Sequence, residues 1–245
     1  MNNRDKLYSN YVSTHTIHLY GEASIEGIKR QFPVWKRYYG RFLPENKNAK
    51  ILDAGCGNGG FIYWLQEMGY VNASGIDISP EQIEVSKRFG VKVEQGDLVE
   101  WLKDNKETMN YDLIFARDVI EHFGKDDISK VAGIFHRALK KGGFLVLYTL
   151  NAESPFGCRL RYGDFTHEVG FTPSAISRLL HMTGFTDTEA REMGPVPFGY
   201  SMASTLRYLV WRTIRVALKV WNIAEMGGAG SGVFTRVFVI SGIKK

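Results

Sequence analysis

The sequence predicts an α/β fold, a doubly wound and mostly parallel sheet with helices on both faces. Five short apolar runs alternate with segments of helical periodicity, the pattern of strands joined by crossover helices. A glycine-rich loop, Gly55–Gly60, lies between the first run and the first helical segment. The chain of 245 residues is 44% hydrophobic and 23% charged, the composition of an ordinary soluble domain with a full core.

The expected elements follow one another at short intervals. Between the first two runs, apolar residues recur at spacings of three and four, which predicts a helix over 61–68. Ser79-Pro80-Glu81-Gln82 combines a capping serine with proline at the first helical position, as helix starts do. The turn Lys141-Gly142-Gly143 precedes the fifth run. The runs are Lys50–Asp53, Ala73–Ile76, Val91–Glu94, Tyr111–Ala116 and Phe144–Tyr148.

The chain after residue 150 differs from the part before it. Residues 151–170 are polar and typical of a loop, and Thr172-Pro173-Ser174 predicts the start of a helix that runs to Gly184. A helical pattern covers 205–225, and Phe234–Ile240 is rich in β-branched and aromatic residues, which predicts a final strand.

The net charge of +5 is unevenly distributed. Residues 205–245 contain seven basic residues and one acidic residue, so the rest of the chain is close to neutral. Within 205–225 three basic residues lie near one line of the helix, and apolar residues with two tryptophans cover most of the remainder. Two interpretations stay open: a helix at a membrane surface, or a helix packed on its own domain or on the partner in a homodimer. The residues concerned are Arg212, Arg215, Lys219, Trp211 and Trp221.

Nucleic acid is not expected as a partner, because the basic residues are too few and too scattered to follow a phosphate backbone. The two cysteines, Cys56 and Cys158, cannot form a disulfide framework, which indicates a reducing compartment. The first residues lack the apolar core of a signal peptide, and no uncharged apolar run reaches about 18 residues. We therefore expect a cytoplasmic protein, peripheral to the inner membrane if the basic helix contacts lipid.

The glycine loop indicates a nucleotide-like ligand. Gly55-x-Gly57-x-x-Gly60 follows a strand and opens a helix, and Asp77 lies 17 residues beyond Gly60, which matches the dinucleotide fingerprint. Glycine lets the backbone turn tightly and approach a ligand closely. A carboxylate at the end of the second strand can accept both hydroxyls of a ribose. The motif predicts an adenosine-bearing cofactor but leaves its identity open.

Two further acids narrow that choice. Asp53 lies two residues before the first glycine, where a carboxylate would repel a pyrophosphate but would suit a cofactor with an amino or sulfonium group. Asp97, 20 residues after Asp77, ends the third strand and could accept from an adenine amino group.

Five motifs in order resemble those of class I S-adenosylmethionine-dependent methyltransferases. They are Leu52–Gly60, Gly75–Ser79, Gly96–Leu98, Asp112–Ile114 and Leu139–Gly143, and the resemblance covers about residues 50–150. It implies a Rossmann-like sheet of seven strands and S-adenosyl-L-methionine as the cofactor. It also implies one domain in three parts: a cap segment (1–45), a cofactor-binding core (46–150) and an acceptor-side remainder (151–245).

The same resemblance implies roles for individual residues. Asp53 and the glycine-loop backbone would hold the methionine part, Asp77 the ribose, and Ile78 would pack on the adenine. The backbone near Ala116 would line the amino-acid end, and N-terminal tyrosines would close over the cofactor. The implied cofactor-binding residues are Tyr8, Tyr11, Asp53, Gly55, Cys56, Gly57, Gly59, Asp77, Ile78, Asp97, Leu98, Ala116 and Arg117.

Methyl transfer to a hydroxyl needs a held nucleophile and a base, for which histidine is the usual choice. Two clusters, Asp118–His122 and Asp164–Glu168, follow the fourth and fifth strands, where open sheets place their ligand crevice. We predict His167 as the base, with His122 and Glu121 as orienting partners or as ligands of a divalent metal. A similar pattern occurs in magnesium-dependent RNA 2′-O-methyltransferases, but Glu-His after this strand is also common in relatives without a metal. A helix-start carboxylate beside a packed imidazole is the structural alternative.

The stretch 151–173 resembles a bacterial subgroup of these methyltransferases associated with surface-polysaccharide biosynthesis. The resemblance implies O-methylation of a sugar hydroxyl, with a saccharide or glycolipid as acceptor. Tyr162 and Phe165 suit sugar rings, and Arg159 and Arg161 suit a neighbouring phosphate or carboxylate. A packed loop with solvated arginines is the alternative.

Three other functions stay open. They are a small-molecule, quinone-pathway-like O-methyltransferase, a non-catalytic cofactor-binding module, and a nicotinamide oxidoreductase, which the glycine motif alone would allow.

Overall fold

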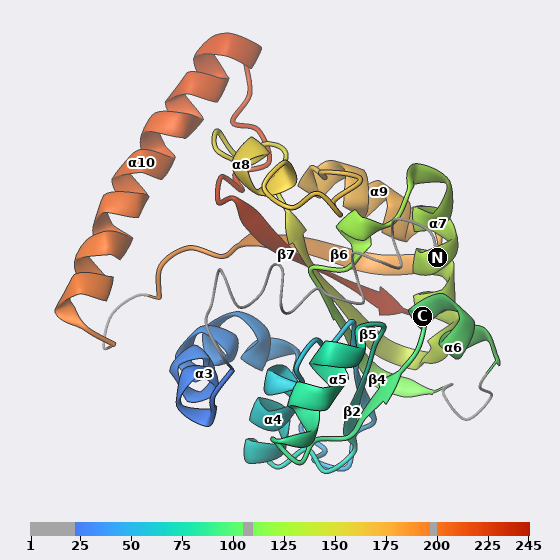
Figure 1. The fold of residues 1–245 in the computed structure, drawn as a ribbon. Helices are drawn as coiled ribbons and strands as arrows, with labels where there is room; N and C mark the ends of the chain where they lie inside the picture. Colours follow the sequence, from blue (N-terminus) through green and yellow to red (C-terminus); the bar gives the residue numbers. More distant parts are fainter. Residues whose placement is uncertain (1–22, 105–109, 197–199) are drawn as a thin grey trace.

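The computed structural model describes residues 23–104, 110–196 and 200–245. At its centre is one sheet of seven strands, and helices cover both faces (Figure 1). The strands are β1 (Ile51–Ala54), β2 (Ala73–Asp77), β3 (Val93–Gln95), β4 (Tyr111–Arg117), β5 (Leu139–Leu150), β6 (Phe185–Glu192) and β7 (Val237–Lys244). They lie in the order β3-β2-β1-β4-β5-β7-β6, and β7 runs antiparallel to both neighbours while the other pairs are parallel. The predicted mostly parallel α/β sheet is confirmed.

The four helices predicted near 61, 80, 173 and 205 begin at Gly60, Pro80, Pro173 and Met202, whereas α8 lies in the stretch 151–170 that was predicted to be a loop. Ser79 caps α5 by accepting from the backbone N–H of Gln82, with Pro80 at the first position. Thr172 caps α9 in the same way through the N–H of Ala175. The helices are α3 (Ile25–Tyr39), α4 (Gly60–Glu67), α5 (Pro80–Lys87), α6 (Leu98–Asp104), α7 (Lys125–Ala138), α8 (Cys158–Arg161), α9 (Pro173–Met182) and α10 (Met202–Met226), with 3₁₀ turns η2 (Gly40–Phe42) and η4 (Ile120–His122).

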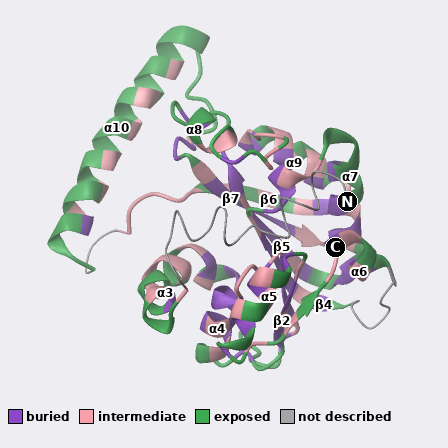
Figure 2. Cartoon of the chain, viewed as in Figure 1, coloured by how far each residue is buried: buried purple, intermediate pink, exposed green. Residues whose placement is uncertain are grey.

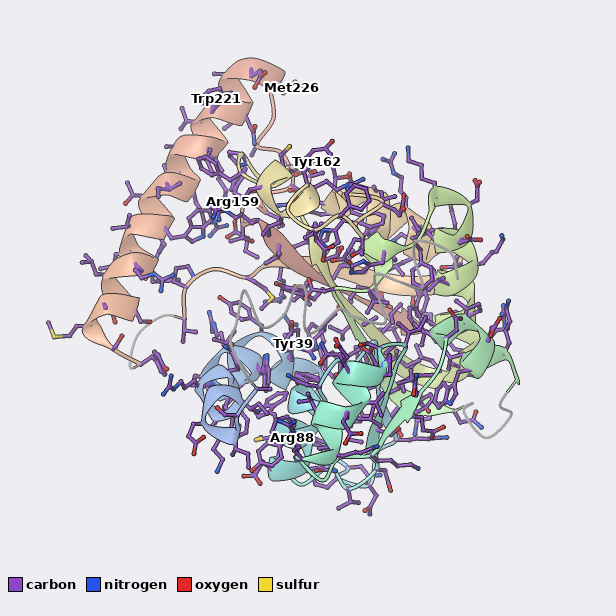
Figure 3. All side chains as sticks on the ribbon, in the orientation of Figure 1. Tyr39, Arg88, Arg159, Tyr162, Trp221 and Met226 are labelled. Atoms are coloured by element: carbon purple, nitrogen blue, oxygen red, sulfur yellow. The ribbon has the colours of Figure 1, made fainter. Side chains whose placement is uncertain are left out.

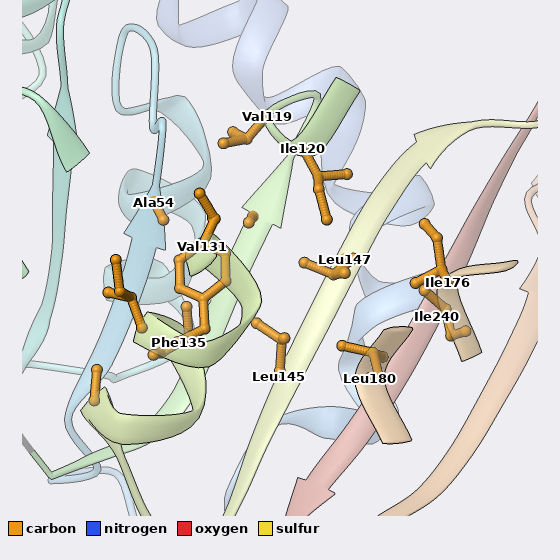
Figure 4. Packing of buried hydrophobic residues seen from close by; sticks show 14 of the residues in the cluster. Ala54, Val119, Ile120, Val131, Phe135, Leu145, Leu147, Ile176, Leu180 and Ile240 are labelled. Atoms are coloured by element: carbon orange, nitrogen blue, oxygen red, sulfur yellow. The ribbon is translucent and has the colours of Figure 1, made fainter. Parts of the chain in front are cut away.

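Alternation along the central strands divides the core into two layers. In β4, Ile114 contributes to a cluster under α7 and α9, whereas Leu113 and Phe115 contribute to a cluster under α3 and α4. Successive strand side chains point to opposite faces, so a strand buried on both sides is apolar throughout. Figure 4 shows the first cluster, in which Val131 and Phe135 of α7 pack near Leu145 and Leu147 of β5.

Three elements differ from their sequence prediction. β6 was not predicted, because along this edge strand only Phe185 is buried and the sequence shows little apolar pattern. β5 begins at Leu139 and includes the predicted turn at Gly142, where the pairing with β4 shifts register. β7 begins at Val237, three residues after the predicted start at Phe234.

α10 confirms the helical pattern of 205–225 but stands apart from the body of the molecule (Figures 1 and 2). Among residues 202–226, all described, Ser204 alone is buried. The helix therefore leaves a long surface uncovered in the single chain. No helix within the described part of the chain is both long enough and apolar enough to cross a membrane.

Candidate active site

The glycine loop after β1 has backbone angles that side chains rarely adopt. Gly55, Gly57 and Gly59 have φ of 68°, 54° and 75°. A Cβ on Gly55 would lie 2.4 Å from Cγ2 of Val119, so the loop passes too close to the end of β4 for any side chain. These are the positions at which the sequence predicted a close backbone approach to a ligand.

Asp77 at the end of β2 is held in place by the loop it faces. Its Oδ2 accepts from the N–H of Gly57 at 2.7 Å, and its Oδ1 accepts from the N–H of Ser79 at 2.9 Å. Burial raises the pKa of Asp77, and these two hydrogen bonds oppose the shift. Each carboxylate oxygen has a second lone pair, so Asp77 can still accept from a ribose diol.

Asp97, at the end of β3, also makes hydrogen bonds that stabilise the fold. Its Oδ1 accepts from the N–H groups of Val99 at 2.9 Å and Glu100 at 3.1 Å, so it caps α6. Asp97 and its neighbour Leu98 also line the cavity described below.

Asp53 and Arg117 form a buried ion pair that the sequence prediction did not anticipate. Nη2 of Arg117 lies 3.1 Å from Oδ2 of Asp53, whose side chain is fully buried, and Nε lies 3.5 Å from Oδ1. Burial raises the pKa of Asp53, and the charge of Arg117 opposes that shift. The guanidinium also lies 4.1 Å from the ring centre of Phe61. Arg117 thus presents its side chain to the cavity, and Asp53 lies behind it.

One cavity of about 1300 Å³ joins the cofactor motifs to the acceptor-side loop. Asp53, Ala116 and Glu121 are fully buried behind its wall, and Tyr8 and Tyr11 lie outside the described residues. The predicted residues that line the cavity are Gly55, Cys56, Gly57, Asp77, Ile78, Asp97, Leu98, Arg117, His122 and His167.

The structure brings the two predicted histidines together. The ring centres of His122 and His167 lie 4.8 Å apart. Nδ1 of His167 lies 3.0 Å from the carbonyl oxygen of Leu160, and Nδ1 of His122 lies 3.3 Å from that of Thr166. A carbonyl only accepts, so each Nδ1 carries the hydrogen, and each neutral ring keeps its basic lone pair on Nε2.

Asp164 completes this arrangement and was not assigned a role from the sequence. Its carboxylate is buried, and Oδ2 lies 4.0 Å from Nε2 of His167. A protonated His167 would therefore have a negative charge beside it. Oδ1 of Asp164 accepts from the N–H of Thr166 at 2.8 Å, which holds the carboxylate in position.

Glu121 lies in η4 rather than in the first turn of an α-helix, and it is buried and does not line the cavity. Thr149 donates to its Oε2 at 3.0 Å, and Oε1 has no hydrogen-bond partner of normal geometry among the described residues. Burial, followed by the charge of Asp118, raises the pKa of Glu121 well above its usual value. Burial likewise raises the pKa of Asp118 to about 6.

Glu121 was predicted either to orient a histidine or to bind a divalent metal, and its surroundings bear on both roles. Its carbonyl oxygen accepts from the N–H groups of Glu168 and Val169, so it anchors the chain directly after His167 through the backbone. Within 23–104, 110–196 and 200–245, no three Asp, Glu, His or Cys side chains are grouped so that they could hold a metal ion. The predicted divalent metal therefore has no support in the described geometry.

The acceptor-side loop uses its two arginines differently. Arg161 donates to the carbonyl oxygens of His167 and Glu168, so its guanidinium braces the loop from within the protein. Arg159 is exposed and lines the cavity. Tyr162 and Phe165 are 77% and 92% exposed, and Figure 3 shows Arg159 and Tyr162 at α8.

A family model described as a methyltransferase domain matches residues 28–190, more than half of the chain. The chain belongs to this methyltransferase family. The resemblance to class I S-adenosylmethionine-dependent methyltransferases is thereby confirmed for the family as a whole. No comparison supports membership of a subgroup associated with polysaccharides.

Similar proteins agree with this assignment. The methyltransferase is 34% identical over 113 residues to the ubiquinone biosynthesis O-methyltransferase of Pelagibacter ubique, a match that covers 43% of each chain. A S-adenosylmethionine-dependent methyltransferase from Archaeoglobus fulgidus shares the fold, with a TM-score of 0.68 and 21% identity over 94% of this chain and 98% of that one.

Haemonchus contortus phosphoethanolamine N-methyltransferase 2, solved in complex with S-adenosyl-L-methionine, has a TM-score of 0.60 and 17% identity, over 97% of this chain and 60% of that one. The chain spans about half or less of the length of the curated relatives it matches.

Several lining residues escaped the sequence analysis. α3 contributes Gln31 and Trp35 to the cavity wall, and β5 contributes Tyr148. α3 lies outside the recognised motifs, and its amphipathic pattern shows that one face is covered without showing what that face covers. The sequence places Arg117 at the end of a strand as a charged residue, but it does not indicate that Asp53 is its partner.

Proposed function

We propose that this methyltransferase transfers the methyl group of S-adenosyl-L-methionine to a hydroxyl oxygen of a saccharide, in a glycan or a glycolipid. The observation that carries the transfer to oxygen is His167, whose basic Nε2 belongs to a ring lining the same cavity as the cofactor motifs. The sugar acceptor has weaker support, from Arg159, which lines the cavity, and from Tyr162 and Phe165, which are exposed on the same loop outside the cavity lining.

The residues present fit the cofactor. The loop at Gly55 has a positive φ and lines the cavity without a side chain, so its backbone faces a ligand there, and Asp77 can accept a ribose diol beside it. Arg117 at the cavity wall offers a cation for the carboxylate of a methionine moiety. When bound, S-adenosyl-L-methionine supplies a methyl group on a positively charged sulfur.

The chain's own residues would remove the proton of the acceptor hydroxyl and stabilise the charge that this leaves on the base. As the acceptor oxygen forms its bond to the methyl carbon, the carbon–sulfur bond breaks, and the hydroxyl proton passes to Nε2 of His167. The carbonyl of Leu160 keeps Nδ1 protonated, so that Nε2 is the nitrogen that accepts. The carboxylate of Asp164, 4.0 Å away, stabilises the resulting imidazolium.

A second function is favoured by one comparison. The 34% identity to a ubiquinone biosynthesis O-methyltransferase supports a small phenolic acceptor, which the same base would serve. Incubation with methyl-labelled S-adenosyl-L-methionine and two acceptor panels, nucleotide-linked or lipid-linked sugars and catechols, separates the two. Label transferred to a sugar hydroxyl supports the proposal, and label transferred to catechols alone contradicts it. Tight cofactor binding without transfer to either panel would indicate a non-catalytic module.

A further inference from the structure

The outward surface of α10 is an uncovered apolar face. We define its outer face as Met202, Leu206, Leu209, Thr213, Val216 and Val220, which recur at spacings of three and four and therefore lie along one side of the helix. Leu206, Val216 and Val220 are 64%, 62% and 61% exposed. A contiguous apolar surface of this kind marks a contact with something outside the chain.

The rotation of α10 about its axis is set by contacts on the opposite side. Arg215 pairs with Glu192 of β6, with Nε and Oε2 at 2.7 Å. Trp211 packs against the backbone of Gly194, and Ser204 donates to the carbonyl oxygen of Val196. These contacts keep the apolar outer face turned away from the body (Figure 2).

The charges beside the outer face are almost all positive. Arg212 and Lys219 lie along one flank, whereas Arg207 lies on the body side of the helix and lines a cavity there with Trp211. Glu225, the single acidic residue of 202–226, accepts from Nε1 of Trp221 at 2.8 Å. Apolar residues with cations along one flank match the boundary between the acyl chains and the headgroups of an anionic bilayer.

A second copy of the chain is the rival occupant, because spacings of three and four also suit a coiled coil. In such a pair, Arg212 and Lys219 would flank the seam between the helices. In a parallel pair they would face alanines of the other helix, and in an antiparallel pair they would face the same two cations. Neither arrangement supplies an acid. The exposed apolar surface is also wider than a coiled-coil seam, because Val210 and Trp221 lie outside the seam and are 51% and 67% exposed.

We propose that the outer face of α10 docks in the plane of an anionic phospholipid bilayer, with Arg212 and Lys219 at the headgroups. The 25-residue helix would lie on the membrane rather than cross it. Trp221 and Met226, at its C-terminal end in Figure 3, would enter the headgroup region. The proposal does not depend on the identity of the methyl acceptor.

Flotation of the full chain with vesicles tests the proposal. We expect association with vesicles in which about a third of the lipid is phosphatidylglycerol, and much less with phosphatidylcholine alone. The double variant Val216→Asn/Val220→Asn should reduce the association at least about tenfold, and Arg212→Gln/Lys219→Gln should reduce it roughly 30-fold on anionic vesicles.

Matched controls lie elsewhere on the surface. Val71→Asn removes a valine that is 70% exposed, and Lys103→Gln/Lys125→Gln removes two exposed cations, so neither should change the association. Helix content by circular dichroism and the thermal midpoint confirm that each variant is folded. Absence of flotation with anionic vesicles, or flotation that both α10 variants leave unchanged, would overturn the proposal. A dimer in sedimentation velocity that Val216→Asn/Val220→Asn dissociates would assign the face to a second copy.

Discussion

Arg117 covers Asp53, with Nη2 and Oδ2 3.1 Å apart in a site where the carboxylate is fully buried. The pair stands at the ends of two neighbouring strands, because Ala54 and Ala116 are register partners in β1 and β4. A carboxylate predicted to attract a cationic cofactor group is thus already balanced by a cation of the protein. Since Arg117 lines the cavity and Asp53 lies behind it, the charge that faces the cavity here is the guanidinium, which suits a carboxylate.

Arg117→Met should destabilise the protein by about 3–5 kcal/mol at neutral pH, because it leaves a buried carboxylate without its partner. The unpaired Asp53 would have a raised pKa in the folded state, so the loss should shrink as pH falls and Asp53 becomes protonated. Urea unfolding at pH 5 and pH 8 measures this. Addition of Asp53→Asn should recover part of the stability at pH 8, and equal losses at both pH values would show that the charge of Asp53 is not the cause.

His167→Gln should lower kcat by about 10²–10⁴-fold, the usual contribution of a general base, with little change in S-adenosylhomocysteine affinity. Initial rates and calorimetry on the same preparation measure the two effects. His181→Gln is the control, since His181 bonds to Phe185 and Thr188 outside the cavity. Full turnover by His167→Gln would remove His167 from the mechanism but leave the enzyme class intact.

Glu121→Gln should become more stable relative to the natural protein as pH rises from about 5 to 8. The folded-state pKa of Glu121 lies well above its usual value of 4.5, so across this range folded Glu121 holds a proton that unfolded Glu121 has already largely lost. That difference lowers the stability of the natural protein as pH rises, and glutamine removes it. Chemical unfolding across this pH range is the measurement, and parallel curves for the two proteins would contradict a neutral Glu121.

Gly55→Ala should destabilise the protein by about 2–5 kcal/mol, because the new Cβ adds a clash to an unfavourable φ. The clash is with Val119, whose Cγ2 would lie 2.4 Å away. Gly142→Ala is the matched control: Gly142 also has a positive φ, 76°, but nothing lies within 4 Å of its Cβ position. Thermal unfolding should show the larger loss of stability for Gly55→Ala. Equal losses for the two variants would mean that the loop shifts to accommodate the methyl group without a cost in free energy.

Local signals in the sequence were enough for much of the fold. The capped start at Ser79, the glycine loop and the apolar runs depend on residues close together in the chain, and each lies near its predicted place. β6 could not be predicted in this way, because an edge strand with a single buried residue, Phe185, is stabilised by pairing with β7 rather than by its own pattern.

The sequence by itself determined the family, the parallel sheet and the approximate position of the candidate site, because strand ends and their loops follow from short-range order. The tertiary structure decided which side chains meet. It paired Asp53 with Arg117 across 64 positions of sequence and brought His122 to His167 across two separate loops. It also left the outer face of α10 uncovered, which depends on how the whole chain packs. Contacts between distant segments are set by the packing of complete elements, and no local pattern specifies them.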